Sequence, residues 1–170
     1  MLEVANKYMD QLQELNYRIR YNDYYKYYNL GSYYDDPEYK TSDWLRSDWV
    51  STTNGEVKAH MKAYLDRDYM IITELTLVNY SQTYVEFYSD FREFIRRLVR
   101  VGFRKICFSV IVGNPAERTY DRFVKRYGGR IVGTHKSHVK LIDGKYYDLK
   151  LYEVFTNNPK LLKSLELQGR

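Results

Sequence analysis

Hydrophobic and polar positions follow two different periods along this chain, and the changes of period divide it into elements. Residues 2–5 (LEVA) form a short apolar run that predicts a strand. Apolar residues then recur at helical spacing from Tyr8 to Ile19, with charged residues between them. This pattern predicts an amphipathic helix over about residues 6–21.

A Tyr-rich stretch, about residues 21–45, follows the first helix and is broken by Pro37. It predicts short helical turns, the second of them around SDWLRSDW (42–49). Many tyrosines in one stretch could form a stacking surface for a ligand or nucleic acid, or pack as amphipathic rings. The sequence leaves both interpretations open.

Beyond residue 48 the apolar residues alternate with polar ones. Asn54-Gly55 separates two extended runs, and because both residues tolerate positive φ this pair predicts a tight hairpin. A charged turn at 66–68 leads into a third extended run. Residues 48–79 are therefore expected to form a three-stranded antiparallel meander.

Helical periodicity returns at Thr83 and ends at Gly102. Thr83 and Glu86 have the spacing of a capping box. The apolar run that follows Gly102 predicts the next strand. Because a long helix separates this strand from the one ending at Val78, the two are expected to lie parallel, joined by a crossover.

The last third of the chain predicts a helix at 115–127, a hairpin across Asp143-Gly144, and a helix at about 159–168 that begins at Pro159. The expected fold is mixed α/β of the α+β type. It has a mostly antiparallel six- to seven-stranded sheet, one parallel strand pair and about four helices, in a single domain spanning 1–170.

Composition adds modest constraints to this picture. The 170 residues are 44% hydrophobic, which suffices for one core. No apolar run is long enough to cross a membrane and the N-terminus lacks the features of a signal peptide, so a cytoplasmic location is expected. A net charge of +5 favours anionic partners such as nucleic acid, although ordinary soluble domains carry similar charge.

Two segments carry a resemblance to a known family. They are GFRKICFSVIVGNPAERTYDRFVKRYGGRIVG (102–133) and DGKYYDLKLYEV (143–154). The chain resembles the GCN5-related N-acetyltransferase (GNAT) superfamily over nearly its whole length. In that family the fourth and fifth strands are parallel and splay apart, and the pantetheine arm of acetyl-CoA lies between them.

The resemblance implies a set of site residues. The family pattern N-x-x-A-x-x-x-Y is similar to Asn114, Ala116 and Tyr120, with one residue fewer between Asn and Tyr. It implies that Tyr120 protonates the leaving thiolate. Asn114 could equally be a helix cap before Pro115, with Tyr120 packed on the sheet. Acetyl-CoA is the implied co-substrate, no metal is expected, and the implied cofactor-binding residues are Leu77, Val78, Asn79, Ser81, Gln82, Thr83, Asn114 and Ala116.

The phosphate-binding loop departs from the family pattern Q/R-x-x-G-x-G/A. Gln82 matches its first position, but Val85 and Phe87 occupy the glycine positions, and Glu86 adds a negative charge. Either the loop takes another path, with Ser81, Gln82 and Thr83 donating to the phosphates, or the cofactor binds weakly, or it does not bind.

Glu74 lies mid-strand in IITELTLV and is a candidate general base. Strand alternation leaves open whether its carboxylate is buried, which would raise its pKa, or faces solvent. His60 is a second candidate base. His135 and His138 are three apart on a strand, which predicts opposite faces and no shared metal. Arg118, Arg122, Lys125 and Arg126 crowd one helix and could hold phosphates or an acidic partner, or form a solvated face.

The resulting hypothesis is an acyl-CoA-dependent N-acyltransferase that moves an acetyl group to an amine of an unknown acceptor, with Glu74 as base and Tyr120 as acid. The alternative is a catalytically inactive protein of the same fold that binds a protein or nucleic acid. A membrane partner is not expected.

Overall fold

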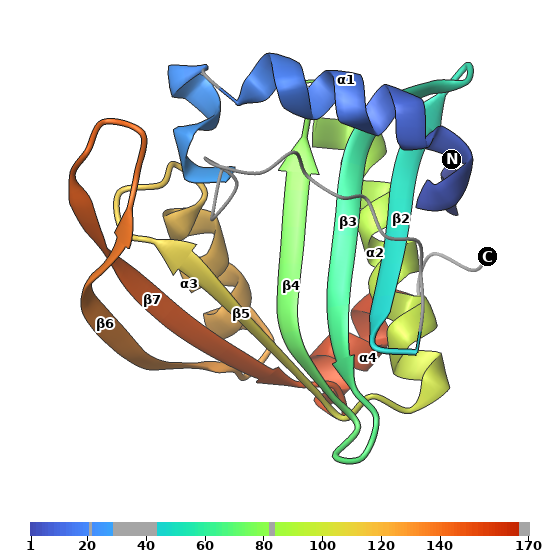
Figure 1. Cartoon of the computed structure of the whole chain (residues 1–170). Helices are drawn as coiled ribbons and strands as arrows, with labels where there is room; N and C mark the ends of the chain where they lie inside the picture. The colour runs from blue at the N-terminus through green and yellow to red at the C-terminus, as the bar shows by residue number, and fades with distance from the viewer. Residues whose placement is uncertain (21, 29–43, 82–83, 167–170) are drawn as a thin grey trace.

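The strands form one sheet with the order β1-β2-β3-β4-β5-β7-β6 (Figure 1). The computed structural model describes residues 1–20, 22–28, 44–81 and 84–166. In these ranges the strands are β1 (Leu2–Val4), β2 (Arg46–Thr53), β3 (Glu56–Asp66), β4 (Ile71–Asn79), β5 (Lys105–Ile111), β6 (Arg130–Lys140) and β7 (Tyr146–Phe155). The helices are η1 (Ala5–Tyr8), α1 (Met9–Ile19), η2 (Asp23–Tyr28), α2 (Tyr84–Val101), α3 (Glu117–Arg126) and α4 (Pro159–Glu166).

The predicted meander is confirmed as β2, β3 and β4, which pair antiparallel in sequence order. Its first turn is at Asn54 and Gly55, with φ of 52° and 79°. The parallel pairing of β4 with β5 is also confirmed, with α2 as the crossover. The mixed sheet with one parallel pair is therefore the fold class that the sequence predicts.

The helical turn predicted around 42–49 is wrong for the described residues, because β2 starts at Arg46. This strand pairs with β1 on one side and with β3 on the other. Those ladder partners are distant in sequence, so local propensity could not reveal them. Most of the remaining Tyr-rich stretch, residues 29–43, lies outside the described residues.

One face of the sheet is covered by α1 (Figure 1). Leu12 of α1 is buried against Val50 and Val57 of the first hairpin. Ile19, at the end of α1, packs with Tyr25 of η2 and Val78 of β4. The amphipathic pattern thus places α1 and η2 on the same face.

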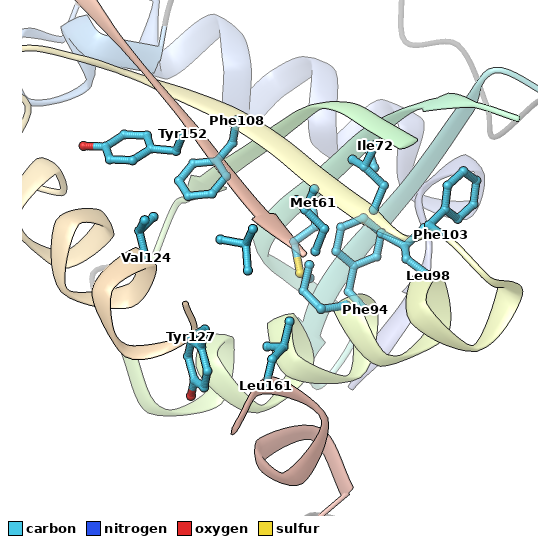
Figure 2. Packing of buried hydrophobic residues seen from close by; sticks show 14 of the residues in the cluster. Met61, Ile72, Phe94, Leu98, Phe103, Phe108, Val124, Tyr127, Tyr152 and Leu161 are labelled. Atoms are coloured by element: carbon cyan, nitrogen blue, oxygen red, sulfur yellow. The ribbon is translucent and has the colours of Figure 1, made fainter. Parts of the chain in front are cut away.

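The opposite face carries the main core, which α2, α3 and α4 cover (Figure 2). Met61 and Ile72 from the sheet pack there with Phe94 of α2, Val124 of α3 and Leu161 of α4. Because successive strand residues alternate between faces, Met61 lies in this core while His60 lies on the α1 face. The sheet therefore separates an apolar face from a more polar one.

Helix ends and turns lie where glycine and capping residues occur in the sequence. Gly102 ends α2 with a φ of 107°, and Gly144 adopts a φ of 75° in the last hairpin. The Asn158 side-chain oxygen accepts a hydrogen bond from the Lys160 N–H (2.9 Å), which caps α4. The proposed capping box of Thr83 and Glu86 falls outside the described residues and side chains.

Two glycines near the start of β6 test the packing of α3 against the sheet. A Cβ on Gly129 would lie 2.4 Å from the Glu153 backbone oxygen and 2.6 Å from Val154 Cγ2. We expect Gly129→Ala to lower the free energy of unfolding by about 1–3 kcal/mol, as measured by urea denaturation. Gly133→Ala is the matched control because a Cβ there meets nothing within 4 Å. Equal stability of the two variants would contradict the close approach.

Candidate active site

The candidate site lies where β4 and β5 stop pairing. Within the described residues, their parallel ladder consists of Ile71 with Lys105 and Ile72 with Ile106. β4 then continues to Asn79 and β5 to Ile111, where β5 pairs only with β7. Backbone groups of both strands therefore face one another beyond this point without forming a ladder.

A β-bulge at Thr73 marks the point of divergence. Ile72 pairs with Leu65 and Glu74 pairs with Tyr64, so Thr73 has no partner on β3. A bulge increases local twist and bends the strand, which turns β4 away from β5. It also shifts the alternation of β4, because Ile72 and Leu75 both pack in the main core.

As a consequence, Glu74 lies on the α1 face of the sheet. Residues directly opposite one another share a face. Three rows cross β2, β3 and β4 on this face: Val50–His60–Val78, Asp48–Lys62–Thr76 and Arg46–Tyr64–Glu74. We call these the polar rows.

Of the two environments left open for Glu74, the structure has the solvent-facing one, because its side chain is exposed. Its carboxylate accepts a hydrogen bond from the Thr76 hydroxyl (3.1 Å). Alternation of apolar and polar residues along β4 does not show which face of the sheet Glu74 occupies. The bulge at Thr73 decides the face, and nothing in the sequence marks it. Glu74 is thus a solvated carboxylate beside the divergence.

The second candidate base, His60, is buried with 8% of its surface exposed. Its Nε2 lies 2.9 Å from Oδ1 of Asp48, which is 2% exposed and also contacts Arg46. A buried carboxylate requires such partners. This arrangement is that of a cross-strand polar cluster that stabilises β2 and β3.

Tyr120 of α3 packs beside β5, on the α2–α4 side of the sheet. Its ring meets Phe108 edge-on, with 5.5 Å between ring centroids, and Phe108 stacks on Tyr152 at 4.9 Å. Figure 2 shows the Phe108 and Tyr152 rings side by side. Burial raises the pKa of Tyr120 to about 12. Its hydroxyl therefore stays protonated near neutral pH.

A charged cluster that sequence reasoning missed fixes α3 on the sheet. Lys150 of β7 contacts Glu117 and lies 3.4 Å from Asp121, both on α3. The Tyr152 hydroxyl donates to Asp121 (2.7 Å). Hydrogen bonds from Lys150 and from the Gly113 N–H hold the pKa of Glu117 below its usual value. The cluster joins β5, α3 and β7 next to Tyr120.

Asn114 begins the turn into α3. Its side-chain oxygen accepts a hydrogen bond from the N–H of Ala116 (2.9 Å), the residue that precedes α3. The side chain of Asn114 therefore stabilises the turn that leads into α3, whose own first residues have no side-chain cap. This bond uses the oxygen, which leaves the amide NH₂ group as the part that could contact a cofactor.

The β4 residues that the family resemblance implied for cofactor binding divide between the two faces. Leu77 packs against the main core, and Val78 packs beneath η2. The Asn79 side-chain oxygen accepts from the N–H and the hydroxyl of Ser81, both at 3.1 Å. A cleft of about 470 Å³ adjoins Ser81, between α1 and the first hairpin.

The predicted phosphate loop falls partly within the described chain. Gln82, Thr83 and the side chains of Val85 and Glu86 lie outside the described part. The helix begins at Tyr84, so Phe87 belongs to α2, and its ring stacks on Phe91 at 6.0 Å. The second glycine position of the family pattern is therefore a core-facing helical residue.

The Tyr-rich η2 crosses the open end of the two strands. The Tyr25 hydroxyl donates a hydrogen bond to the carbonyl of Tyr80, which follows β4 (3.4 Å). The Tyr27 hydroxyl lies close to Gly113, which follows β5: a Cβ added to this glycine would be 3.4 Å from it. Lys26 lies near the Tyr27 and Tyr147 rings and 3.8 Å from Asp143. This helix therefore connects the two halves of the sheet where the ladder is missing.

The opposite-face prediction for His135 and His138 is wrong. Their rings stack with centroids 4.9 Å apart. Between His135 and Val139, three residues of β6 stand opposite Asp148 alone, and Ser137 has a φ of 48°. This bulge brings both rings to one side. Within the described ranges, no group of three or more His, Cys, Asp or Glu side chains is placed to hold a metal ion.

Comparison with solved structures identifies the fold. The chain matches spermidine N-acetyltransferase from Vibrio cholerae, solved with CoA and spermine, at a TM-score of 0.69 and 13% identity, over 95% of this chain and 97% of that one. A GNAT-family acetyltransferase from Streptococcus pneumoniae matches at 0.67 and 15%, over 91% and 98%. A third match is the crystal structure of an acetyltransferase, with a TM-score of 0.57 and 17% identity. This match covers 74% of the present chain and 65% of the length of that protein.

These likenesses show that the chain has the fold of the GCN5-related N-acetyltransferases, as the sequence resemblance implied. No family model and no curated protein matches the sequence. None of the described helices is long and apolar enough to cross a membrane.

The raised pKa of Tyr120 predicts a stability change in alkali. The unfolded chain loses the Tyr120 proton at about pH 10 and the folded chain at about pH 12. The contribution of this group to the free energy of unfolding therefore decreases as the pH rises from about 10 to about 12. We expect the free energy of unfolding of the wild type to fall by roughly 1 kcal/mol relative to Tyr120→Phe as the pH rises from about 9 to about 11. Urea denaturation at each pH measures the difference.

The control is Tyr17→Phe, which makes the same change at an exposed position on α1. The pH-dependent change for Tyr120→Phe should exceed the change for this exposed control. An equal change in the two variants would contradict the buried hydroxyl.

Proposed function

We propose that this chain is an acyl-CoA-dependent N-acyltransferase that transfers an acetyl group from acetyl-CoA directly to an amine. The observation that carries the proposal is the loss of pairing between β4 and β5 beyond Ile72 and Ile106. Backbone N–H and C=O groups that lack a ladder can hydrogen-bond the amides of a pantetheine arm. The structural neighbour solved with CoA and spermine has the same fold.

Tyr120 is proposed as the general acid. Attack of an amine on the thioester carbonyl forms the new C–N bond, and collapse breaks the C–S bond and releases a thiolate. This thiolate needs a proton, and a phenol that is neutral at pH 7 can supply it. The ring of Tyr120 packs edge-on against Phe108, on the part of β5 that lies beyond the ladder with β4. The thiol and the amide are then the products.

Glu74 is proposed as the base on the acceptor side. The amine must lose one proton to attack and another after attack. The Glu74 carboxylate is exposed on the α1 face, in the same row as Tyr64 and next to the bulge. A carboxylate there would also attract a cationic amine. The acceptor would therefore approach along the polar rows, with the cofactor between β4 and β5.

A binding protein of the same fold without catalysis is the competing function. Phe87 is a packed helical residue where the family has a phosphate-loop glycine. The oxygens of Asn79 and Asn114 are engaged in local turns. On this alternative, the strands diverge but no cofactor enters.

Calorimetry with acetyl-CoA discriminates between the two functions. We expect binding with a dissociation constant at or below about 1 mM, the upper range of typical enzyme substrates. Free CoA serves as the comparator for the acetyl group. Absence of heat at millimolar acetyl-CoA, with the protein folded by circular dichroism, would favour the non-catalytic function.

Substitution of the proposed acid and base tests the mechanism once an accepting amine is found by screening. Tyr120→Phe and Glu74→Gln should each lower kcat about 100-fold, the low end of general acid–base contributions, with acetyl-CoA affinity nearly unchanged. The matched controls are Tyr127→Phe, which follows α3, and Glu56→Gln, an exposed carboxylate on β3. Unchanged turnover in either test variant would remove that residue from the mechanism.

A further inference from the structure

The charges of α3 are segregated between its two sides. Its acidic residues, Glu117 and Asp121, face the sheet and are engaged by Lys150 and Tyr152. Its basic residues are all exposed to solvent. They lie at positions i, i+4, i+7 and i+8, which is one stripe along a helix. We call this set the α3 stripe: Arg118, Arg122, Lys125 and Arg126.

The α3 stripe concentrates four positive charges on one helix face of a chain whose net charge is +5. The chain has 27 lysines and arginines, and the 23 that lie outside the stripe nearly balance the 22 acidic residues. None of the four forms an ion pair with a residue that the structure describes. Arg122 donates only to the Arg118 carbonyl, and Arg126 lies over the Tyr127 ring.

Helix stability alone does not explain the stripe. Lys125 and Arg126 are in the last turn, where cations interact favourably with the helix dipole. Arg118 is in the first turn, where the dipole disfavours a cation. Mixed charges are also usual on a solvated face, whereas the charged residues of α3 classed as exposed are all positive. The Asp121 side chain is 41% exposed, but it is engaged by Tyr152 and Lys150.

We propose that the α3 stripe binds the phosphate backbone of a nucleic acid. Every exposed residue of α3 is polar, namely Thr119 and the four cations. An interface with a protein normally needs a buried apolar centre, which this face of α3 lacks. A polyphosphate chain needs only cations in a row, and it is bound without reading sequence. This inference is independent of acyl transfer, because the stripe faces away from the sheet.

Fluorescence anisotropy with a labelled uridine homopolymer tests the proposal. Neutralising four phosphates of a single strand gives a slope of log K against log salt of about −2.8. Wild type should therefore lose about 50-fold in affinity between about 50 mM and about 200 mM salt. Absence of binding at the lower salt concentration would overturn the proposal.

A pair of double variants locates the site. Arg122→Gln with Lys125→Gln should weaken binding and reduce the slope by about 1.4, since two phosphate contacts are lost. The control, Arg100→Gln with Lys163→Gln, removes the same charge from exposed positions on α2 and α4. Thermal unfolding checks that both fold. Equal weakening in the two would mean that overall charge binds RNA, and would overturn the proposal.

Competition with two other anions, polyglutamate and free CoA, tests whether the α3 stripe prefers RNA. Polyglutamate of matched charge should compete much less well than unlabelled RNA, and equal competition would assign the stripe to an acidic protein instead. Millimolar free CoA should leave RNA binding unchanged. Displacement by CoA would assign the stripe to the cofactor phosphates and would equally overturn the proposal.

Discussion

The bulge at Thr73 is the constraint on which the rest of this structure depends. It interrupts the register between β3 and β4 immediately after the last residue pair that joins β4 to β5. A regular strand would continue the ladder and leave the sheet closed. Because the bulge twists β4 away, the strand ladder joins the two halves of the sheet at their base, while η2 contacts both halves at the open end. The proposed cofactor position exists only because of this divergence.

The bulge also sorts chemistry between the two faces of the sheet. It sends Glu74 to the α1 face while Leu75 and Leu77 stay in the main core. On the other face, Lys150 and Tyr152 of β7 contact Glu117 and Asp121 of α3. These contacts hold α3 against the sheet. Tyr120 is thereby placed beside Phe108. A proposed acid and base thus approach the divergence from opposite sides, and the α3 stripe faces away from both.

Much of the fold could be predicted from local pattern because its elements begin and end with strong signals. Asn54-Gly55, Gly102 and Pro159 each mark an element boundary that the structure confirms. The failures share a cause. Among the described residues of the helical turn predicted around 42–49, strand pairing with distant partners begins at Arg46. A bulge in β6 brings His135 and His138 to one side instead of opposite faces. Irregular register has no compositional signature, and for the same reason the sequence could not decide which face Glu74 occupies.

By itself, the sequence determined the order of elements, the parallel strand pair and the residue types available for acid–base chemistry, because periodicity and turn residues act locally. Only the tertiary structure decided which face Glu74 occupies, which partner holds His60, and that Asp121 and Lys150 fix the helix carrying Tyr120. Those outcomes depend on contacts between residues far apart in the chain. A one-residue change in strand register reverses them while leaving every local pattern intact.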